Sequence, residues 1–226
     1  MNGTSANAQP DAAAVVAGVL ARAIADRAAT VIVLLEHDTP EGALLRAWIE
    51  TQLGAGHCII VSASDSLASA VARDARGLAP SGEPAASFER AECTRALGRV
   101  VARRLRGIVA HPINKTALLL GDDFPPEPLL PLGDLYASQV QELADGCTLP
   151  PRVRDLAERA GGLRRLDSTL YALLDRRVDA ALACVGLPPA VRTDILRMLD
   201  GGRAARRHLG LIPKLGRATP GIDLWW

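Results

Sequence analysis

Ionisable side chains crowd into one short segment, Glu36, His37 and Asp38, which directly follows an apolar run at 30–35. Carboxylates and imidazoles are common metal ligands, so one hypothesis is a metal site completed by His57 from the end of the next strand. Such a site requires both segments to lie at the carboxyl edge of a sheet, where α/β proteins bind their ligands. Two histidines on separate loops favour this hypothesis only weakly.

The same segment also has the pattern of a helix start, and we favour that interpretation. Thr39 is a preferred N-cap residue, and Pro40 suits the first helical turn. Glu36, Asp38 and Glu41 would then place up to three negative charges near the helix N-terminus. Carboxylates there interact favourably with the helix dipole and stabilise the helix by roughly 0.3–1 kcal/mol. They would also repel an incoming phosphate.

Further polar candidates lie in the middle of the chain. Asp122 and Asp123 stand in a proline-rich loop and are weak candidates for a Mg²⁺ site, although such a pair is more often solvated loop charge. Asn114 and Lys115 begin a short helix, which they are expected to cap. His111, as a lone histidine, is interpreted as a structural or surface residue.

Alternating strands and helices must position these side chains. Apolar, β-branched runs predict buried parallel strands at 30–35, 58–62 and 107–110. Apolar residues at helical spacing predict helices at 12–27, 39–53, 66–76, 88–106, 114–120, 134–144, 150–161, 170–185 and 189–199. Strands that alternate with long helices imply right-handed βαβ units. The expected fold class is therefore α/β, with a doubly wound parallel sheet and a helical C-terminal extension.

We expect a single domain with three parts. Residues 1–27 form an N-terminal tail and helix, residues 28–149 form the α/β core, and residues 150–226 form the C-terminal helices and tail of the same domain. The segment 77–86 is rich in Pro, Gly and Ser and is expected to be a loop.

The segment 114–144 resembles a characteristic part of the NAD synthase family. It reads NKTALLLGDDFPPEPLLPLGDLYASQVQELA. Family members carry N-K-(S/T)-E-L-L-L-G at a helix start and, after an acidic loop, P-L-G-D-L-Y-K-x-Q-V-x-x-L-A. The segments before and after Asp122 both match, in the right order.

Three other segments extend the resemblance over roughly 28–217. The segment 102–115 (ARRLRGIVAHPINK) is similar to the family's A-x-x-L-G-G-L-V-x-G-T-G-N-K. Residues 171–175 resemble its Y-x-x-L-D helix, and 203–214 (RAARRHLGLIPK) resembles its E-x-K-R-R-x-P-P-x-P-K. The resemblance implies the ATP-pyrophosphatase fold, also called adenine nucleotide alpha-hydrolase-like, of the ammonia-dependent NAD synthetases.

The resemblance also implies a reaction and a site. Family members activate the carboxylate of deamido-NAD with ATP and Mg²⁺, release pyrophosphate and let ammonia attack the adenylate. Residues that would contact the nucleotide or substrate are Asn114, Lys115, Asp134 and Lys214, and Asp134 is also expected to accept backbone hydrogen bonds near its own helix start. The family further implies a homodimer, with the PLGDLY helix near the interface.

The sequence departs from the family pattern where the chemistry takes place. The family's phosphate loop S-G-G-x-D-S is replaced by a degenerate segment, 36–39, which has no glycine pair and is followed by Pro40, which removes a donor N–H. Ala117 stands where the family has a metal-binding Glu, and Ala137 where it has a Lys. We therefore assign no catalytic residue and no metal ligand.

The helix that binds the adenylate in the family is altered as well. Its N-x-Q-A-R-x-R pattern has Glu92 and Thr94 at the two arginine positions. Arg90 and Arg95 lie nearby but are expected to point in other directions, because each helical residue turns by about 100°. They are interpreted as solvated partners of neighbouring glutamates.

Three functions follow from these observations. The favoured one is a non-catalytic NAD synthase-like homologue that acts as a binding protein or partner subunit. The alternative is an active ATP-dependent amide-forming ligase with an atypical phosphate loop, for which ATP and Mg²⁺ would be the cofactors. A third is an enzyme of another class, built on His37, Asp38 and His57.

Composition excludes some broader classes. The formal net charge is +1 and aromatic residues are 3% of the chain, so we expect no nucleic-acid partner. No apolar run is long enough to span a membrane. The four cysteines form no CxxC pair, and we interpret them as reduced, mostly buried thiols of a cytoplasmic protein.

Overall fold

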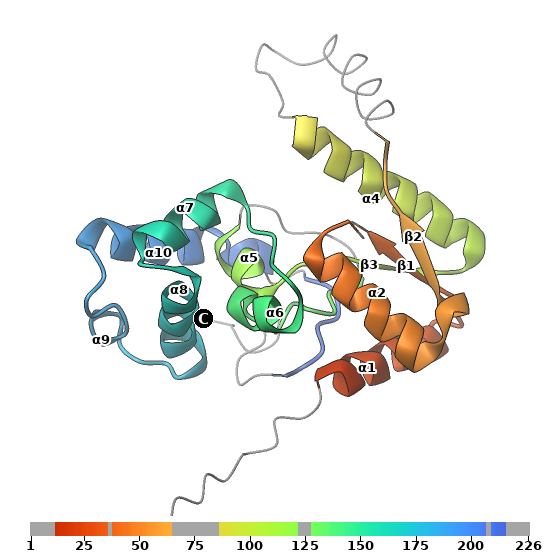
Figure 1. Cartoon of the computed structure of the whole chain (residues 1–226), viewed down its shortest axis with the longest axis horizontal. Coiled ribbons are helices and arrows are strands. Elements are labelled where there is room, and N and C mark those ends of the chain that lie inside the picture. Colours follow the sequence, from red (N-terminus) through yellow and green to blue (C-terminus); the bar gives the residue numbers. More distant parts are fainter. Residues whose placement is uncertain (1–11, 36–37, 65–85, 122–127, 207–208, 216–226) are drawn as a thin grey trace, which may run out of the picture.

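The computed structural model describes residues 12–35, 38–64, 86–121, 128–206 and 209–215. The predicted helix at 66–76, all but the last residue of the predicted loop at 77–86, and the candidates Glu36, His37, Asp122 and Asp123 lie outside the described residues. An α/β part and a helical part stand side by side, with helices α5 and α6 between them (Figure 1). The α/β elements are α1 (Ala12–Asp26), β1 (Ile32–Leu35), α2 (Pro40–Leu53), η1 (Ala55–His57), β2 (Cys58–Val61), α4 (Ala86–Leu105) and β3 (Ile108–Ala110).

The three described strands form a parallel sheet in the order β2-β1-β3, as the sequence predicts. Ile32 at the start of β1 pairs with Cys58 of β2 on one side and with Ile108 of β3 on the other. The carboxyl ends of the strands therefore meet at one edge of the sheet. The segment that leads into α2 leaves from that edge.

Helices cover both faces of this sheet. Along β1, side chains alternate between the two faces: Ile32 and Leu34 pack in the cluster that includes α1 and α2, whereas Val33 and Leu35 pack against α4. All four are fully buried, which explains the unbroken apolar run. Gly98 lets α4 approach closely, because a Cβ there would lie 2.4 Å from Leu35 Cδ2. The doubly wound α/β fold class is confirmed.

The helical part buries its own apolar cluster, built from side chains of α5, α6, α7, α8, η2 and α10. Its elements are α5 (Lys115–Leu120), α6 (Ala137–Leu143), α7 (Pro151–Arg159), α8 (Leu163–Leu170), the π-helix η2 (Tyr171–Asp175), α9 (Ala180–Ala183), α10 (Pro189–Gly201) and α11 (Arg203–Arg206). Of these, α5, α7 and α10 agree with the predicted helices to within a few residues, whereas α8 and α11 were not predicted.

Two predicted helices were wrong in extent. The predicted helix at 170–185 is interrupted, because Arg177 adopts a positive φ of 52° and Asp179 then caps the separate helix α9. The predicted helix at 134–144 begins only at Ala137, because the preceding residues form turns closed by the bonds of Gly133 N to Leu130 O and Leu135 N to Leu132 O.

A late segment of the chain extends the sheet beyond β3. Leu129 forms a parallel bridge with Ala110 and another with Leu211. Leu211 N donates to Pro128 O at 2.8 Å, and Leu211 O accepts from Leu130 N at 2.9 Å. Two loops far apart in sequence are thereby fixed to the sheet.

Two further findings concern earlier expectations. All four cysteines are free thiols, but only Cys184 is buried and the other three are half-buried, so burial is less complete than expected. Within the described residues, no helix is both long and apolar enough to cross a membrane.

Candidate functional site

The segment after β1 is a capped helix start. Gly42 N donates to Thr39 Oγ1 at 3.1 Å, and Thr39 has the extended backbone of an N-cap. Pro40 occupies the first turn, where its missing N–H has no helical partner to lose. The favoured interpretation of this segment is confirmed. Asp38, beside it, is exposed.

Glu41 was expected to repel a phosphate at the protein surface, but its side chain points into the protein. Its side chain is buried, and its Oε1 accepts hydrogen bonds from Thr148 N at 2.6 Å and from Asn114 Nδ2 at 3.1 Å. Its Oε2 is also buried and has no hydrogen bond to any described residue. Glu41 therefore links α2 to the start of α5 inside the protein.

The metal hypothesis that joined His57 to the segment after β1 is wrong. His57 precedes β2 and so lies at the amino edge of the parallel sheet, whereas Asp38 follows β1 at the carboxyl edge. Four strand residues at about 3.3 Å each separate the two edges by roughly 13 Å. Within the described part of the chain, no group of three His, Cys, Asp or Glu residues is arranged to hold a metal ion.

Asn114 caps α5, as the sequence predicts. Its Oδ1 accepts from Ala117 N at 2.9 Å, while its Nδ2 donates to Glu41 and to Thr148 O, the latter at 3.3 Å. The side chain is only 1% exposed. Both ends of the amide are thus occupied by the protein itself.

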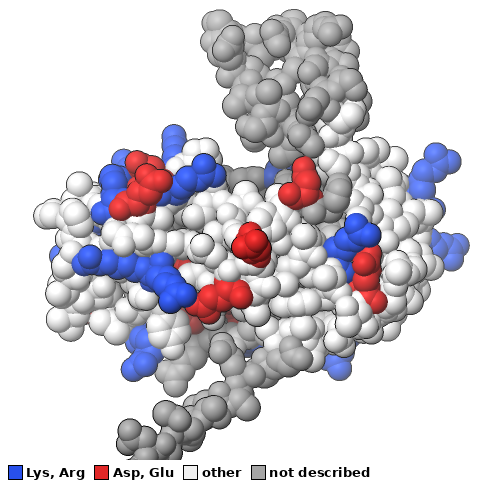
Figure 2. All heavy atoms as spheres, viewed as in Figure 1, with Lys and Arg blue, Asp and Glu red and all other residues white. Residues whose placement is uncertain are grey.

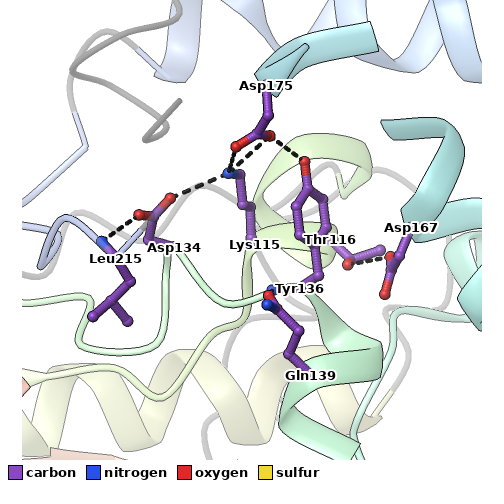
Figure 3. Close-up of polar contacts among 8 residues, drawn as sticks. All are labelled: Lys115, Thr116, Asp134, Tyr136, Gln139, Asp167, Asp175 and Leu215. Atoms are coloured by element: carbon purple, nitrogen blue, oxygen red, sulfur yellow. Dashed lines mark hydrogen bonds and ion pairs between the residues drawn. The ribbon is translucent and has the colours of Figure 1, made fainter. Parts of the chain in front are cut away.

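Lys115 lies at the centre of a buried polar cluster (Figure 3). Its Nζ is 3.2 Å from Asp134 Oδ1, and 3.3 and 3.2 Å from the two carboxylate oxygens of Asp175. It also lies 4.6 Å from the centroid of the Tyr136 ring, which is a cation–π distance. Its side chain is 0% exposed. One cation thus joins α5, the turn before α6 and the end of η2.

Tyr136 completes this cluster from the other side of Asp175. Its hydroxyl donates to Asp175 Oδ2 at 2.6 Å, and its backbone N–H donates to Gln139 Oε1 at 2.8 Å (Figure 3). Burial raises the pKa of the Tyr136 phenol strongly, and its hydrogen bond to Asp175 raises it further. The phenol therefore stays protonated and acts as a donor.

Asp134 holds a different partner from the one expected. Its Oδ2 accepts from Leu215 N at 2.6 Å, a backbone group 81 residues later, rather than from its own helix start (Figure 3). The preceding residue, Lys214, is exposed. Of the four residues predicted to contact substrate, the structure therefore buries Asn114, Lys115 and Asp134 and leaves only Lys214 at the surface.

A second buried carboxylate adjoins this cluster. Asp167 accepts from the Thr116 hydroxyl and from Ser138 N, both at 2.7 Å, and Thr116 Oγ1 accepts from Ala137 N at 2.9 Å. Burial raises the pKa of the Asp167 carboxyl, while the hydrogen bonds from Thr116 and Ser138 oppose that rise. These contacts attach the start of α6 to α5 and α8.

Sequence reasoning missed Thr116 and Asp167, although one signal was present. Leu163, Leu166 and Leu170 form an apolar stripe at helical spacing, and Asp167 falls inside that stripe. A carboxylate on the apolar face of a helix needs a buried hydrogen-bond partner. The pattern thus predicts a buried polar contact, though not its partner.

The helix α4 carries a charged pair with one buried and one exposed partner: the side chain of Arg95 is 4% exposed and that of Glu92 is 46% exposed. Arg95 Nη1 lies 2.5 Å from Glu92 Oε1, so the predicted pairing is confirmed, but Arg95 is buried rather than solvated. Thr94 is also buried, and its hydroxyl accepts from Ala63 N at 3.0 Å. His111 is buried too, in agreement with a structural role. The side chain of Arg90 lies outside the described residues.

Known proteins are similar to this chain in sequence. No protein-family model matches the sequence. The NH(3)-dependent NAD(+) synthetase of Chlorobium phaeobacteroides is 27% identical over 141 residues, which are 54% of this chain and 50% of that protein. The enzyme of the same name from Chlorobium phaeovibrioides is 30% identical over 135 residues, 51% of this chain and 48% of that protein. The chain is NAD synthetase-like. It spans about half the length of the curated relatives that it matches.

Solved structures share the fold of this NAD synthetase-like chain. The NH3-dependent NAD synthetase of Campylobacter jejuni, in complex with nitrate, superposes with a TM-score of 0.60 at 13% identity, over 86% of this chain and 94% of that one. The glutamine-dependent NAD+ synthetase of Acinetobacter baumannii, in complex with ADP, gives 0.52 at 18% identity, over 98% of this chain and 52% of that one. At these identities the likeness concerns the fold alone.

Proposed function

We propose that this NAD synthetase-like chain has lost ATP-dependent amidation of deamido-NAD and acts as a non-catalytic homologue, a binding or partner subunit. One observation carries the proposal. The motif residues that survive, Asn114, Lys115 and Asp134, are buried and bonded to the protein's own groups. Their retention is accounted for by the fold.

The positions where the motif has lost polar residues support the same conclusion. Ala117 and Ala137, which replace the family's Glu and Lys, are 4% and 0% exposed, and Ala137 N–H is bonded to Thr116. Neither position offers a charged group to a phosphate or a metal. Losing a single stabilising group at an active site costs about 10²–10³ in rate, so their combined loss should leave little of the reaction.

We further propose that the protein is a cytoplasmic homodimer. The PLGDLY segment, which the resemblance places near the interface, has its side chains buried within its own chain. The contact would therefore be made by the exposed face of the following helix, α6, where Leu143 is 48% exposed.

Ligand binding and turnover test the proposed loss of activity together. Thermal unfolding is measured with Mg-ATP, with deamido-NAD and with both, and NAD formation is assayed with ammonium present. An active NH3-dependent NAD synthetase serves as the positive control. A ligand at 100 times its Kd would add about 2.7 kcal/mol and raise the unfolding midpoint by several degrees. We expect no such rise with Mg-ATP and no NAD.

A shift with Mg-ATP, or NAD formation, would overturn the proposal and establish the alternative, an active ligase with an atypical phosphate loop. The variant Lys214→Ala would then identify the site, since Lys214 is the one predicted substrate residue that is exposed. Its removal should weaken ATP-dependent stabilisation without unfolding the protein.

A further inference from the structure

A cavity of about 370 Å³ lies within the helical part, between α5, η2, α9, α10 and α11. Its wall is mostly apolar and includes Leu119, Leu173, Leu196 and Leu199. Its polar groups come from α10 and α11: Asp200, Arg203 and Arg206. Cavities of 300–1,000 Å³ with apolar walls and a few polar groups are the usual sites of small ligands.

The irregular backbone of η2 forms part of the wall of this cavity. In this π-helical turn, hydrogen bonds span five residues, as from Arg176 N to Tyr171 O. Just after the turn, Val178 N donates to Ala172 O. The chain then enters α9, which has only four residues and covers the cavity incompletely. Such π-helical turns occur frequently at functional sites.

Arg206 gives the cavity its charge. Its side chain is buried, its Nη1 donates to Leu119 O at 3.1 Å, and its Nη2 donates to Leu199 O. Among the described residues it forms bonds to carbonyls but no ion pair with a carboxylate. Burial lowers the pKa of its guanidinium, and neighbouring Arg203 lowers it further.

The remaining charges at the rim act on Arg206 in opposite directions: Arg203 lowers the pKa of its guanidinium, whereas Asp200 raises it. Arg203 Nη2 lies 3.0 Å from Asp200 Oδ1, and these two side chains are both partly exposed. Among the described residues that line the cavity, two arginines accompany one aspartate, which leaves one net positive charge. A buried guanidinium that has carbonyl acceptors but no carboxylate beside it is costly, so an anion that enters here gains a favourable contact.

We propose that this cavity binds a small monocarboxylate with an apolar body, its carboxylate directed at Arg203 and Arg206 and its body against the leucines. At about 30 Å³ for each water-sized group, the volume accommodates roughly ten to twelve heavy atoms. Guanidinium groups match the planar carboxylate geometry, whereas a neutral or cationic head would leave the positive charge uncompensated. The inference does not depend on the proposed loss of catalysis.

Calorimetric titration of the full chain with three probes of equal chain length tests this assignment. Decanoate, 1-decanol and decylammonium are titrated below the concentrations at which they aggregate. We expect decanoate to bind at one site and to raise the unfolding temperature. Decanol should bind about tenfold more weakly or worse, because it lacks the charge-assisted hydrogen bonds, and decylammonium should not bind.

Two variants locate the site, and Arg206 is left intact because it holds α11 in place. Leu196→Trp fills the cavity and should abolish decanoate binding, and Arg203→Gln should weaken it about tenfold. Val100→Trp adds the same side chain to the exposed face of α4 and should leave binding unchanged. Equal affinity for decanol and decanoate, unchanged affinity in Leu196→Trp, or no decanoate binding at millimolar concentration would each overturn the proposal.

Discussion

Lys115 is a fully buried cation placed between two carboxylates, Asp134 and Asp175. Removing its charge would take away the cation that lies between these two buried carboxylates. We predict that Lys115→Met lowers the free energy of unfolding by about 3–5 kcal/mol. Asp175→Asn should cost less, because the pair of Lys115 with Asp134 remains. Urea denaturation of the variants measures both differences.

A matched surface pair is the control for this prediction. Arg164 Nη2 lies 3.1 Å from Glu142 Oε1, but the two side chains are 81% and 60% exposed. Glu142→Gln should therefore change stability little. If Lys115→Met were no more damaging than Glu142→Gln, the buried cluster would not be a determinant of the fold.

At the level of single residues, the sequence showed which residues are important better than it showed what they contact. The motif identified Asn114, Lys115 and Asp134, but their partners could not be read from it. Lys115 and Asp175 are 60 residues apart, and Asn114 and Glu41 are 73 apart. Local periodicity carries no information about which distant side chain meets which.

Two helices begin with different kinds of cap, and the difference can be measured. Thr39 makes a single capping bond at a partly buried site, whereas Asn114 caps α5 and also donates to Glu41 and to Thr148. Thr39→Ala should cost about 1 kcal/mol. Asn114→Ala should cost roughly 2–3 kcal/mol, since it also removes a donor from the buried carboxylate of Glu41.

Chemical denaturation at neutral pH compares the two caps directly. The double variant should show additive losses if the caps act independently. Equal losses in the two single variants would mean that the bonds from Asn114 Nδ2 contribute nothing to stability.

The regular elements were largely predictable, and the exceptions have physical causes. Strands β1 and β3 follow from β-branched runs, and the starts of α2 and α5 follow from their caps. The π-helix η2 was not predictable, because its sequence YALLD is compatible with an ordinary α-helix. The late start of α6 depends on turn bonds and on distant partners that no local pattern indicates.

At the scale of the whole molecule, the chain carries nearly equal numbers of basic and acidic residues, 26 and 25. Arginines lie next to acidic side chains on the face shown in Figure 2. The proposed homodimer is therefore expected to form through apolar contacts rather than through a large charged patch. This supports the choice of Leu143 on α6 as a contact of the proposed homodimer.

We predict that light scattering gives twice the chain mass of 23.8 kDa at micromolar concentration. Leu143→Asp should shift the protein towards single chains, because it buries a charge in the contact. Val100→Asp, at a comparably exposed site on α4, should not. Single chains for the unmodified protein at about 100 μM would disprove the dimer, and dimers in Leu143→Asp would place the contact elsewhere.

Leu211 pairs with Leu129 beside the sheet, and Leu215 N donates to Asp134 in the polar cluster. During translation, these contacts can form only after residues 211–215 have been synthesised. Until these residues leave the ribosome, Asp134 lacks a backbone donor and Leu129 lies on an open strand edge. Contacts so distant in sequence form slowly, because the intervening chain must first be ordered. The nascent protein therefore cannot complete this part of its core until residues 211–215 have been synthesised, and its open edge would be a natural substrate for chaperones until then.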